Sequence, residues 1–164
     1  MLLDVKSVDK KFNGVYALKG LDFSLGEGEV HGLIGENGAG KSTFIKILGG
    51  IYKRDVGNIL WNGKDLPEVI RPEESRKLGI NIIFQDNVLI PAFTGMENIC
   101  LGRPYPVKGG LIQWKEMERE IEAKAAELGI HLDLKRTVSM MTPAQKKCVE
   151  IVRAMMSDCK LLIL

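Results

Sequence analysis

Residues that bind metals or form disulfides are scarce in this chain. It has three cysteines, Cys100, Cys148 and Cys159, with no C-x-x-C pair, and only two histidines, His31 and His131. We therefore expect no structural metal site and no disulfide framework. We expect the thiols to be reduced, small apolar residues of a cytosolic protein.

Long apolar runs and an excess of one charge are also missing. No run approaches the ~20 residues that a membrane-spanning helix needs, and the N-terminus lacks the charged and then apolar pattern of a signal peptide. Lys and Arg number 23 against 21 Asp and Glu, a net charge of +2. This balance gives no reason to expect nucleic acid as a partner. The 164 residues, 45% of them hydrophobic, suffice for a soluble domain with a full core.

The most informative segment present is a glycine-rich loop with the sequence Gly35-Glu36-Asn37-Gly38-Ala39-Gly40-Lys41-Ser42. It fits the G-x-x-x-x-G-K-[ST] pattern at every fixed position. The glycines let the backbone turn its N–H groups toward a polyphosphate, Lys41 supplies a positive charge, and Ser42 supplies a hydroxyl for Mg²⁺. The loop therefore predicts binding of a nucleoside triphosphate. The alternative is a turn that contains Lys and Ser by chance.

The flanks of the loop favour the functional interpretation. Glu29–Ile34 is typical of a short strand that enters the loop, and Thr43–Leu48 is typical of a helix that stops at Gly49-Gly50. A helix that begins at the loop would favour an anion there.

The N-terminal half has further β signals. Leu21, Phe23 and Leu25 alternate with polar neighbours, which predicts antiparallel strands near the N-terminus, and Asn62-Gly63 predicts a tight hairpin. A short helix near Pro72, ended by Gly79, should precede a buried strand, Ile80–Phe84, that leads to Gln85.

The C-terminal half is richer in helix signals, so we expect two lobes with a boundary near residue 86. Residues 86–106 contain several prolines and glycines and predict loop and short turns. Helical spacing from Trp114 to Leu128 predicts an amphipathic helix. Thr142-Pro143-Ala144-Gln145 opens another helix with an N-cap, a proline at the first position and a capping box.

The last residues, Leu161–Leu164, predict a buried strand. Chain termini usually lie at the polar surface, so we expect this sequence to be a fragment of a longer domain; the alternative is a native C-terminus at Leu164. In P-loop ATPases an acidic residue near magnesium follows such a strand, and another group orients water; neither follows Leu164 here.

With these residues in place, the chain resembles the nucleotide-binding domain of an ATP-binding cassette (ABC) transporter over its whole length. Within that family it is most similar to the importer ATPases for monosaccharides of the ribose, galactose or xylose type. The segments that carry the resemblance are Gly28–Thr43, Ala17–Gly20 and Val149–Ile151. The resemblance implies an α/β fold: a P-loop NTPase core with an N-terminal antiparallel β subdomain and an α-helical subdomain, truncated in the Walker B strand. It implies a β subdomain and core at 1–86, a helical subdomain at 87–159 and the truncated strand at 160–164.

The resemblance also assigns roles to single residues. Phe12 falls at the position whose ring stacks on adenine, with Tyr16 as the second candidate, and Gln85 falls at the catalytic glutamine that contacts magnesium and the attacking water. Phe12 could equally be an ordinary core or edge aromatic. The residues expected to bind ATP in the loop are Gly35, Glu36, Asn37, Gly38, Ala39, Gly40, Lys41, Ser42 and Thr43, and those expected to bind Mg²⁺ are Ser42 and Gln85.

The family signature that contacts ATP across a dimer is usually Leu-Ser-Gly-Gly-Gln, and Met141–Gln145 aligns with it. Here Thr142 keeps a hydroxyl and Gln145 is retained, but Pro143 and Ala144 replace the glycines. Proline removes one N–H group, although a helix start still presents unpaired amides to an anion. We expect Thr142, Ala144 and Gln145 to form a variant signature. The alternative is merely a well-capped helix.

The resemblance implies a head-to-tail dimer with a second nucleotide-binding domain, and transmembrane permease subunits that dock near residues 86–97. The protein would then be cytoplasmic and peripheral on the inner face of the membrane. The leading hypothesis is the ATPase domain of a sugar importer whose present fragment binds nucleotide without hydrolysing it. The alternatives are a non-hydrolysing nucleotide-gated scaffold and a soluble P-loop kinase or GTPase, although no guanine-reading Asn-Lys-x-Asp segment is present.

Overall fold

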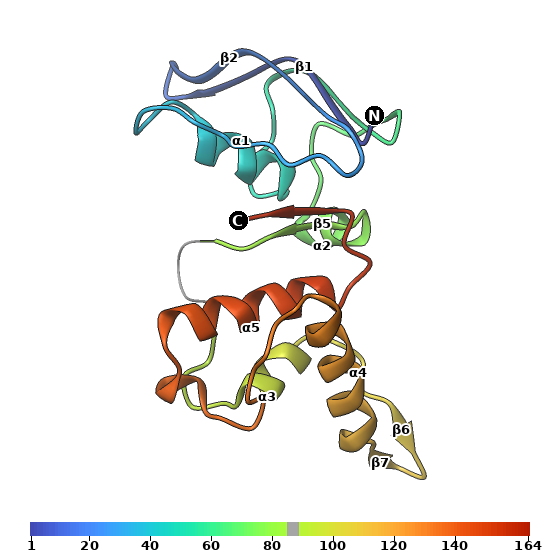
Figure 1. Ribbon diagram of the computed structural model, residues 1–164. Coiled ribbons are helices and arrows are strands. Elements are labelled where there is room, and N and C mark those ends of the chain that lie inside the picture. Colours follow the sequence, from blue (N-terminus) through green and yellow to red (C-terminus); the bar gives the residue numbers. More distant parts are fainter. Residues whose placement is uncertain (85–88) are drawn as a thin grey trace. The chain divides into compact units, whose positions relative to one another are not determined.

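The computed structural model describes residues 1–84 and 89–164 (Figure 1). The chain divides into two compact units, Met1–Ile80 and Asn81–Leu164. The first unit holds β1 (Leu3–Phe12), β2 (Val15–Leu25), α1 (Lys41–Leu48), β3 (Val56–Trp61), β4 (Lys64–Asp65) and α2 (Pro72–Lys77). After β5 (Ile80–Ile82), the second holds α3 (Gly95–Cys100), β6 (Val107–Lys108), β7 (Leu111–Ile112), α4 (Trp114–Glu127), α5 (Pro143–Met155) and β8 (Leu161–Ile163).

An antiparallel sheet with strand order β2-β1-β3-β4 dominates the first unit. The β1–β2 and β3–β4 turns place Asn13-Gly14 and Asn62-Gly63 at positive φ, 50° and 85° in the first and 49° and 74° in the second. Asparagine and glycine accept this conformation at little cost, which is why these dipeptides form tight hairpins. The antiparallel N-terminal strands and the Asn62-Gly63 hairpin are therefore confirmed.

The strand predicted at Glu29–Ile34 is wrong, because this segment has no regular secondary structure. Val30 and Ile34 are each 97% exposed. A strand exists only when its backbone bonds to a neighbour, and the structure pairs these residues with no strand in the part of the chain that it describes. A side chain holds the start of the segment instead: Gly26 N donates to Glu29 Oε2 at 2.7 Å.

Arg54 anchors the segment that joins α1 to β3. It is 5% exposed, and its guanidinium donates to the carbonyls of Gly57 at 2.9 Å, Pro67 at 2.9 Å and Leu66 at 2.7 Å. Burial of a charged group is costly unless hydrogen bonds replace water, and these three carbonyls do so. Arg54 therefore fixes the backbone that follows the glycine-rich loop and its helix.

In the second unit, α3 lies where only loop and turns were predicted, so that prediction is wrong. The prolines and glycines nearby obscured a local capping box. Thr94 Oγ1 accepts from Glu97 N at 3.2 Å, and Thr94 N donates to Glu97 Oε2 at 2.8 Å. Asn98, fully buried, then ties α3 to the preceding loop: its amide donates to the carbonyls of Ile90 and Thr94 and accepts from Ile90 N at 2.7 Å.

The two long helices of the second unit are where the sequence predicts them. α4 packs with α3 and α5 around one apolar core. The buried members of this core are Leu89, Ile99, Cys100, Met117, Ile121, Ala125, Leu134, Val138, Met141, Val149 and Val152. The predicted strands at 80–84 and 161–164 are present as β5 and β8, which pair with each other, although Leu161–Ile163 are only half-buried.

Among residues 1–84 and 89–164, no helix is long and apolar enough to cross a membrane. The three cysteines are free, and burial raises the pKa of the Cys100 and Cys159 thiols. A raised pKa keeps a thiol protonated and unreactive.

The α3 capping box predicts a specific acid sensitivity. The Thr94 N–H, and then its hydroxyl, lower the pKa of Glu97. Because the folded pKa lies below the unfolded one, the stabilisation is complete above about pH 5 and is lost as the pH falls through the folded pKa. Glu97→Gln should therefore remove about 0.5 kcal/mol or less of the pH dependence of unfolding between pH 6 and 3, since the carboxylate is exposed. Thermal melts across this range measure it.

The matched control is Glu116→Gln, because Glu116 also lies in the first turn of a helix, α4, and that helix has no side-chain cap. Equal pH dependence of the Glu97 and Glu116 variants would contradict the capping account.

Candidate nucleotide site

The glycine-rich loop, Gly35–Ser42, runs over the surface into the start of α1. Residues 35–39 are exposed, and Gly38 and Gly40 both have φ of 89°. Ala39 N donates to Glu36 O at 3.1 Å, which closes a turn inside the loop. Positive φ at two glycines so close together curls successive N–H groups toward one side, a geometry that suits an anion.

Gly40, the last glycine, is the buried one, and β2 covers it. A Cβ at this position would collide with the carbonyl oxygen of Ala17 and lie 2.6 Å from Leu18 Cδ2. At Gly38 a Cβ would meet nothing within 4 Å. The sheet therefore fixes the end of the loop at the point where the helix begins, whereas Gly38 is constrained by its backbone conformation alone.

The first turn of α1 is left without a cap. Its N-cap is Gly40, which has no side chain, and no side chain bonds to the first amides. The first intrahelical bond runs from Phe44 N to Gly40 O at 2.9 Å. The amides of Lys41, Ser42 and Thr43 are thus left to water or a ligand. By contrast, threonine side chains cap α3 and α5. Unpaired donors and the positive end of the helix dipole together form an anion site.

The Lys41 side chain folds back onto the loop. Its Nζ donates to Gly35 O at 2.6 Å and to Glu36 O at 2.8 Å. These bonds hold the ammonium against the first two residues of the loop. The third ammonium proton remains available to a phosphate oxygen, since an ammonium has three donors.

Ser42 lies at the second position of α1 and is exposed, and Thr43 follows it, half-buried. Gln85, the other predicted metal contact, lies outside the described residues. In the portion of the chain that is described, no group of three or more His, Cys, Asp or Glu residues could hold a metal ion. A Mg²⁺ ion at this site would therefore take its ligands from the triphosphate and from the Ser42 hydroxyl. These are oxygen ligands, which a hard cation prefers.

Phe12 and Tyr16, the two candidates for base stacking, flank the β1–β2 turn. Both are exposed, Phe12 by 40% and Tyr16 by 43%. The Tyr16 ring has two ammonium groups over it, Lys11 Nζ at 4.2 Å and Lys19 Nζ at 5.5 Å from the centroid. Phe12 has one, Lys10 Nζ at 5.2 Å. An adenine that stacked on Tyr16 would compete with two cations, and one that stacked on Phe12 with a single cation. Phe12 is therefore the better candidate for base stacking.

The signature segment, Met141–Gln145, begins α5 in the second unit. Thr142 Oγ1 accepts from Gln145 N at 3.3 Å, and Thr142 N donates to Gln145 Oε1 at 2.9 Å. The capping box predicted here is therefore present. Thr142 and Ala144 are exposed, and Gln145 is half-buried. Since Pro143 has no N–H group, Ala144 carries the unpaired amide at this helix start.

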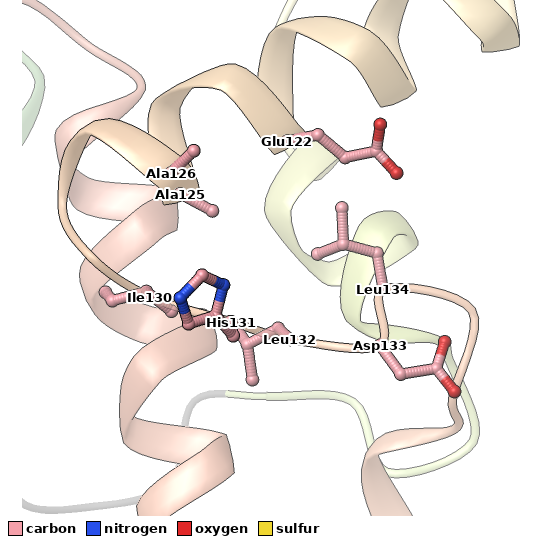
Figure 2. Close-up of a pocket in the computed structure, with 8 residues that line it drawn as sticks. All are labelled: Glu122, Ala125, Ala126, Ile130, His131, Leu132, Asp133 and Leu134. Carbon is pink, nitrogen blue, oxygen red and sulfur yellow. The ribbon is translucent and has the colours of Figure 1, made fainter.

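A separate hollow of about 410 Å³ lies in the second unit, between the end of α4 and the following loop. Figure 2 shows its lining: Glu122, Ala125, Ala126, Ile130, His131, Leu132, Asp133 and Leu134. No residue predicted to bind nucleotide lines it. We assign it no ligand.

The fold and the loop together are those of a P-loop nucleotide-binding cassette, and the family comparison agrees. The model of the ABC transporter family matches residues 18–164. The chain belongs to the ABC transporter family.

The chain is also similar to individual proteins of known kind. The ribose import ATP-binding protein RbsA of Geobacillus kaustophilus is 41% identical over 164 residues, 99% of this chain and 33% of that protein. RbsA 1 of Rubrobacter xylanophilus is 44% identical over 163 residues, 99% of this chain and 32% of that protein. The chain therefore spans about a third of the length of these curated relatives.

Solved structures show the same fold. A nucleotide-free ATP-binding cassette from an ABC transporter aligns with a TM-score of 0.81 and 28% identity, over 98% of this chain and 67% of that one. The ADP conformation of an ATP-binding cassette aligns with a TM-score of 0.81 and 29% identity, over 98% and 66%. The predicted fold class, a P-loop cassette with an antiparallel β subdomain and helices, is confirmed.

The residues that support Phe12 were not found from the sequence. Tyr52, Lys10 and Asp55 all contact the Phe12 neighbourhood in the structure. Tyr52 and Asp55 lie some forty positions along the chain from Phe12, and no local pattern links them. Only the alternation of β1, which puts Lys10 and Phe12 on one face, gave a usable signal.

Two loop variants separate steric from conformational demands. Gly40→Ala combines positive φ with a backbone clash, whereas Gly38→Ala has positive φ alone. We expect Gly40→Ala to lower the free energy of unfolding by more than ~2 kcal/mol and Gly38→Ala by about 1–2 kcal/mol. Urea titration measures both. Equal losses would contradict the packing of the loop against β2.

Proposed function

We propose that this chain is the ATP-binding part of an ABC importer for a sugar. The observation that carries the proposal is the uncapped, exposed start of α1 with Lys41 held over it. Relatives at 41% and 44% identity that are named as ribose import ATP-binding proteins support the sugar class. The particular sugar would be selected elsewhere in the transporter.

In this proposal the triphosphate lies on the loop from Gly35 to Thr43. The amides of the first turn of α1 donate to phosphate oxygens, and Lys41 adds a charge-assisted hydrogen bond. The Phe12 ring stacks on adenine. Mg²⁺, held by Ser42 and Gln85, would neutralise phosphate charge when bound.

The same proposal assigns the remaining parts. Residues 1–86 form the β subdomain and core, 87–159 the helical subdomain and 160–164 the start of the next core strand. A second nucleotide-binding domain would place its signature residues Thr142, Ala144 and Gln145 on the bound ATP. Permease subunits would dock near residues 86–97, on the cytoplasmic face of the membrane. Asn98, fully buried, supports this assignment, because it bonds to the backbone of Ile90 and Thr94 and so fixes part of this segment.

Hydrolysis needs a group that activates water. The chain spans about a third of the length of its curated relatives, and we assign nucleotide binding to these residues. A longer protein that contains them would hydrolyse ATP.

A second candidate is a nucleotide-gated module that does not hydrolyse ATP. The signature segment favours it, because Pro143 lacks an N–H group and the Thr142 and Gln145 side chains bond to each other's backbone. Turnover by the longer protein with its permease separates the two candidates: rapid hydrolysis supports the importer ATPase, and its absence supports the gated module.

Lys41→Ala tests triphosphate binding at the loop, which both candidate functions require. Loss of one charge-assisted bond to phosphate should weaken MgATP binding about ten- to a hundred-fold. Isothermal titration calorimetry measures the affinity. Lys77→Ala, at the exposed end of α2, removes an equal charge and should leave it unchanged. Equal affinity of the Lys41 variant and the wild type would contradict the proposed site.

A further inference from the structure

The Phe12 ring does not stand alone at the end of β1. Its centroid lies 5.1 Å from that of Tyr52, with the ring planes at 68° (edge-to-face). Such pairs are favourable beyond the area that they bury, and they favour one mutual orientation. Tyr52 therefore restrains the direction in which Phe12 can face.

Tyr52 is itself fastened to the helix that the glycine-rich loop begins. Ile51 N and Tyr52 N both donate to Lys46 O, at 2.8 Å and 3.1 Å. The Lys46 ammonium also lies 5.4 Å from the Tyr52 ring centroid. Tyr52 is thus held at the C-terminal end of α1, and its ring contacts Phe12.

A partly buried ion pair between Lys10 and Asp55 restrains the same ring a second time. Lys10 Nζ lies 5.2 Å from the Phe12 centroid and donates to Asp55 Oδ1 at 2.8 Å. The Lys10 side chain is only 9% exposed. Asp55 is fixed in turn, because its Oδ2 accepts from Lys11 N at 2.7 Å and its own N–H donates to Asp9 O at 3.0 Å. The hydrogen bond from Lys10, and then that from Lys11 N, lower the pKa of Asp55, so this carboxylate stays ionised at neutral pH.

Tyr16 has no such aromatic support within the described part of the chain. Two ammonium groups lie over the Tyr16 ring, so a base that stacked there would compete with two cations. Phe12 is already ordered by its neighbours. It therefore offers a fixed ring face, which is what base stacking requires.

We propose that Tyr52 is a positioning residue for the base of the nucleotide. Its ring holds Phe12 in the stacking orientation and links it to α1, so that the same helix supports both the phosphate loop and the base contact. This inference rests on the proposed function, since it needs ATP at the loop and adenine at Phe12. Tyr52 does not contact the ligand in this account.

The test compares Tyr52→Ala and Tyr52→Phe with the wild-type full chain. Calorimetry measures binding of MgATP and of magnesium tripolyphosphate, which has the phosphates and no base. Tyr52→Ala should weaken MgATP binding about three- to ten-fold and leave tripolyphosphate binding unchanged. Tyr52→Phe keeps the ring and should restore the wild-type value.

The matched control is Tyr105→Ala. Tyr105 forms an edge-to-face pair with Trp114 in the other unit, with centroids 5.8 Å apart, and it is similarly exposed at 38%. This variant should bind MgATP as the wild type does. Thermal melts of all variants show that each is folded.

Two results would overturn the inference while the proposed function stands. One is unchanged MgATP affinity in Tyr52→Ala. The other is an equal loss for MgATP and tripolyphosphate, which would show that Tyr52 supports α1 and not the base. Failure of the wild type to bind MgATP at all would instead overturn the proposed function.

Discussion

Unpaired backbone N–H groups at the start of α1 are the feature on which the account of this protein depends. Glycine at the N-cap leaves the first amides without a side-chain partner, and the positive end of the helix dipole points the same way. A folded chain normally satisfies such donors, as the threonine caps of α3 and α5 do here. The start of α4 also lacks a side-chain cap, but among the described helices only at α1 do the unpaired amides follow a glycine-rich loop whose lysine ammonium bonds to the loop carbonyls, a combination that suits a phosphate ligand.

Several parts of the first unit keep this helix start in place. The carbonyl of Ala17 and the Leu18 side chain leave no room for a Cβ at Gly40. At the other end of α1, Ser75 Oγ donates to Leu48 O at 2.7 Å, so α2 is tied to the helix. Arg54 fixes the chain that leaves it. The loop is therefore a local feature with support from across the unit.

Local signals made the loop, α4 and α5 predictable from the sequence. The loop motif is contiguous, and the start of α5 has three signals within four residues. α3 carried an equally local capping box, but the prolines and glycines around it favoured an irregular segment. The strand at Glu29–Ile34 failed for a different reason: its apolar residues gave the right pattern, but a strand also needs a paired neighbour.

The residues proposed to contact the adenine base could be predicted only in part from the sequence. Phe12 came from the family resemblance, and its role stays a prediction, as do those of Gln85 and of the signature residues. The contacts that restrain Phe12 join residues far apart in the sequence, so only the folded structure reveals them. Side chains that act through tertiary contacts leave no periodic pattern in a single sequence.

Hydrogen exchange of the loop amides tests the central claim most directly. If the amides of Lys41, Ser42 and Thr43 bind the triphosphate, saturating MgATP should slow their exchange strongly, because a bound phosphate oxygen replaces water as the acceptor. Tripolyphosphate with magnesium should protect the same amides. Unchanged exchange at these amides under saturating MgATP would contradict the account.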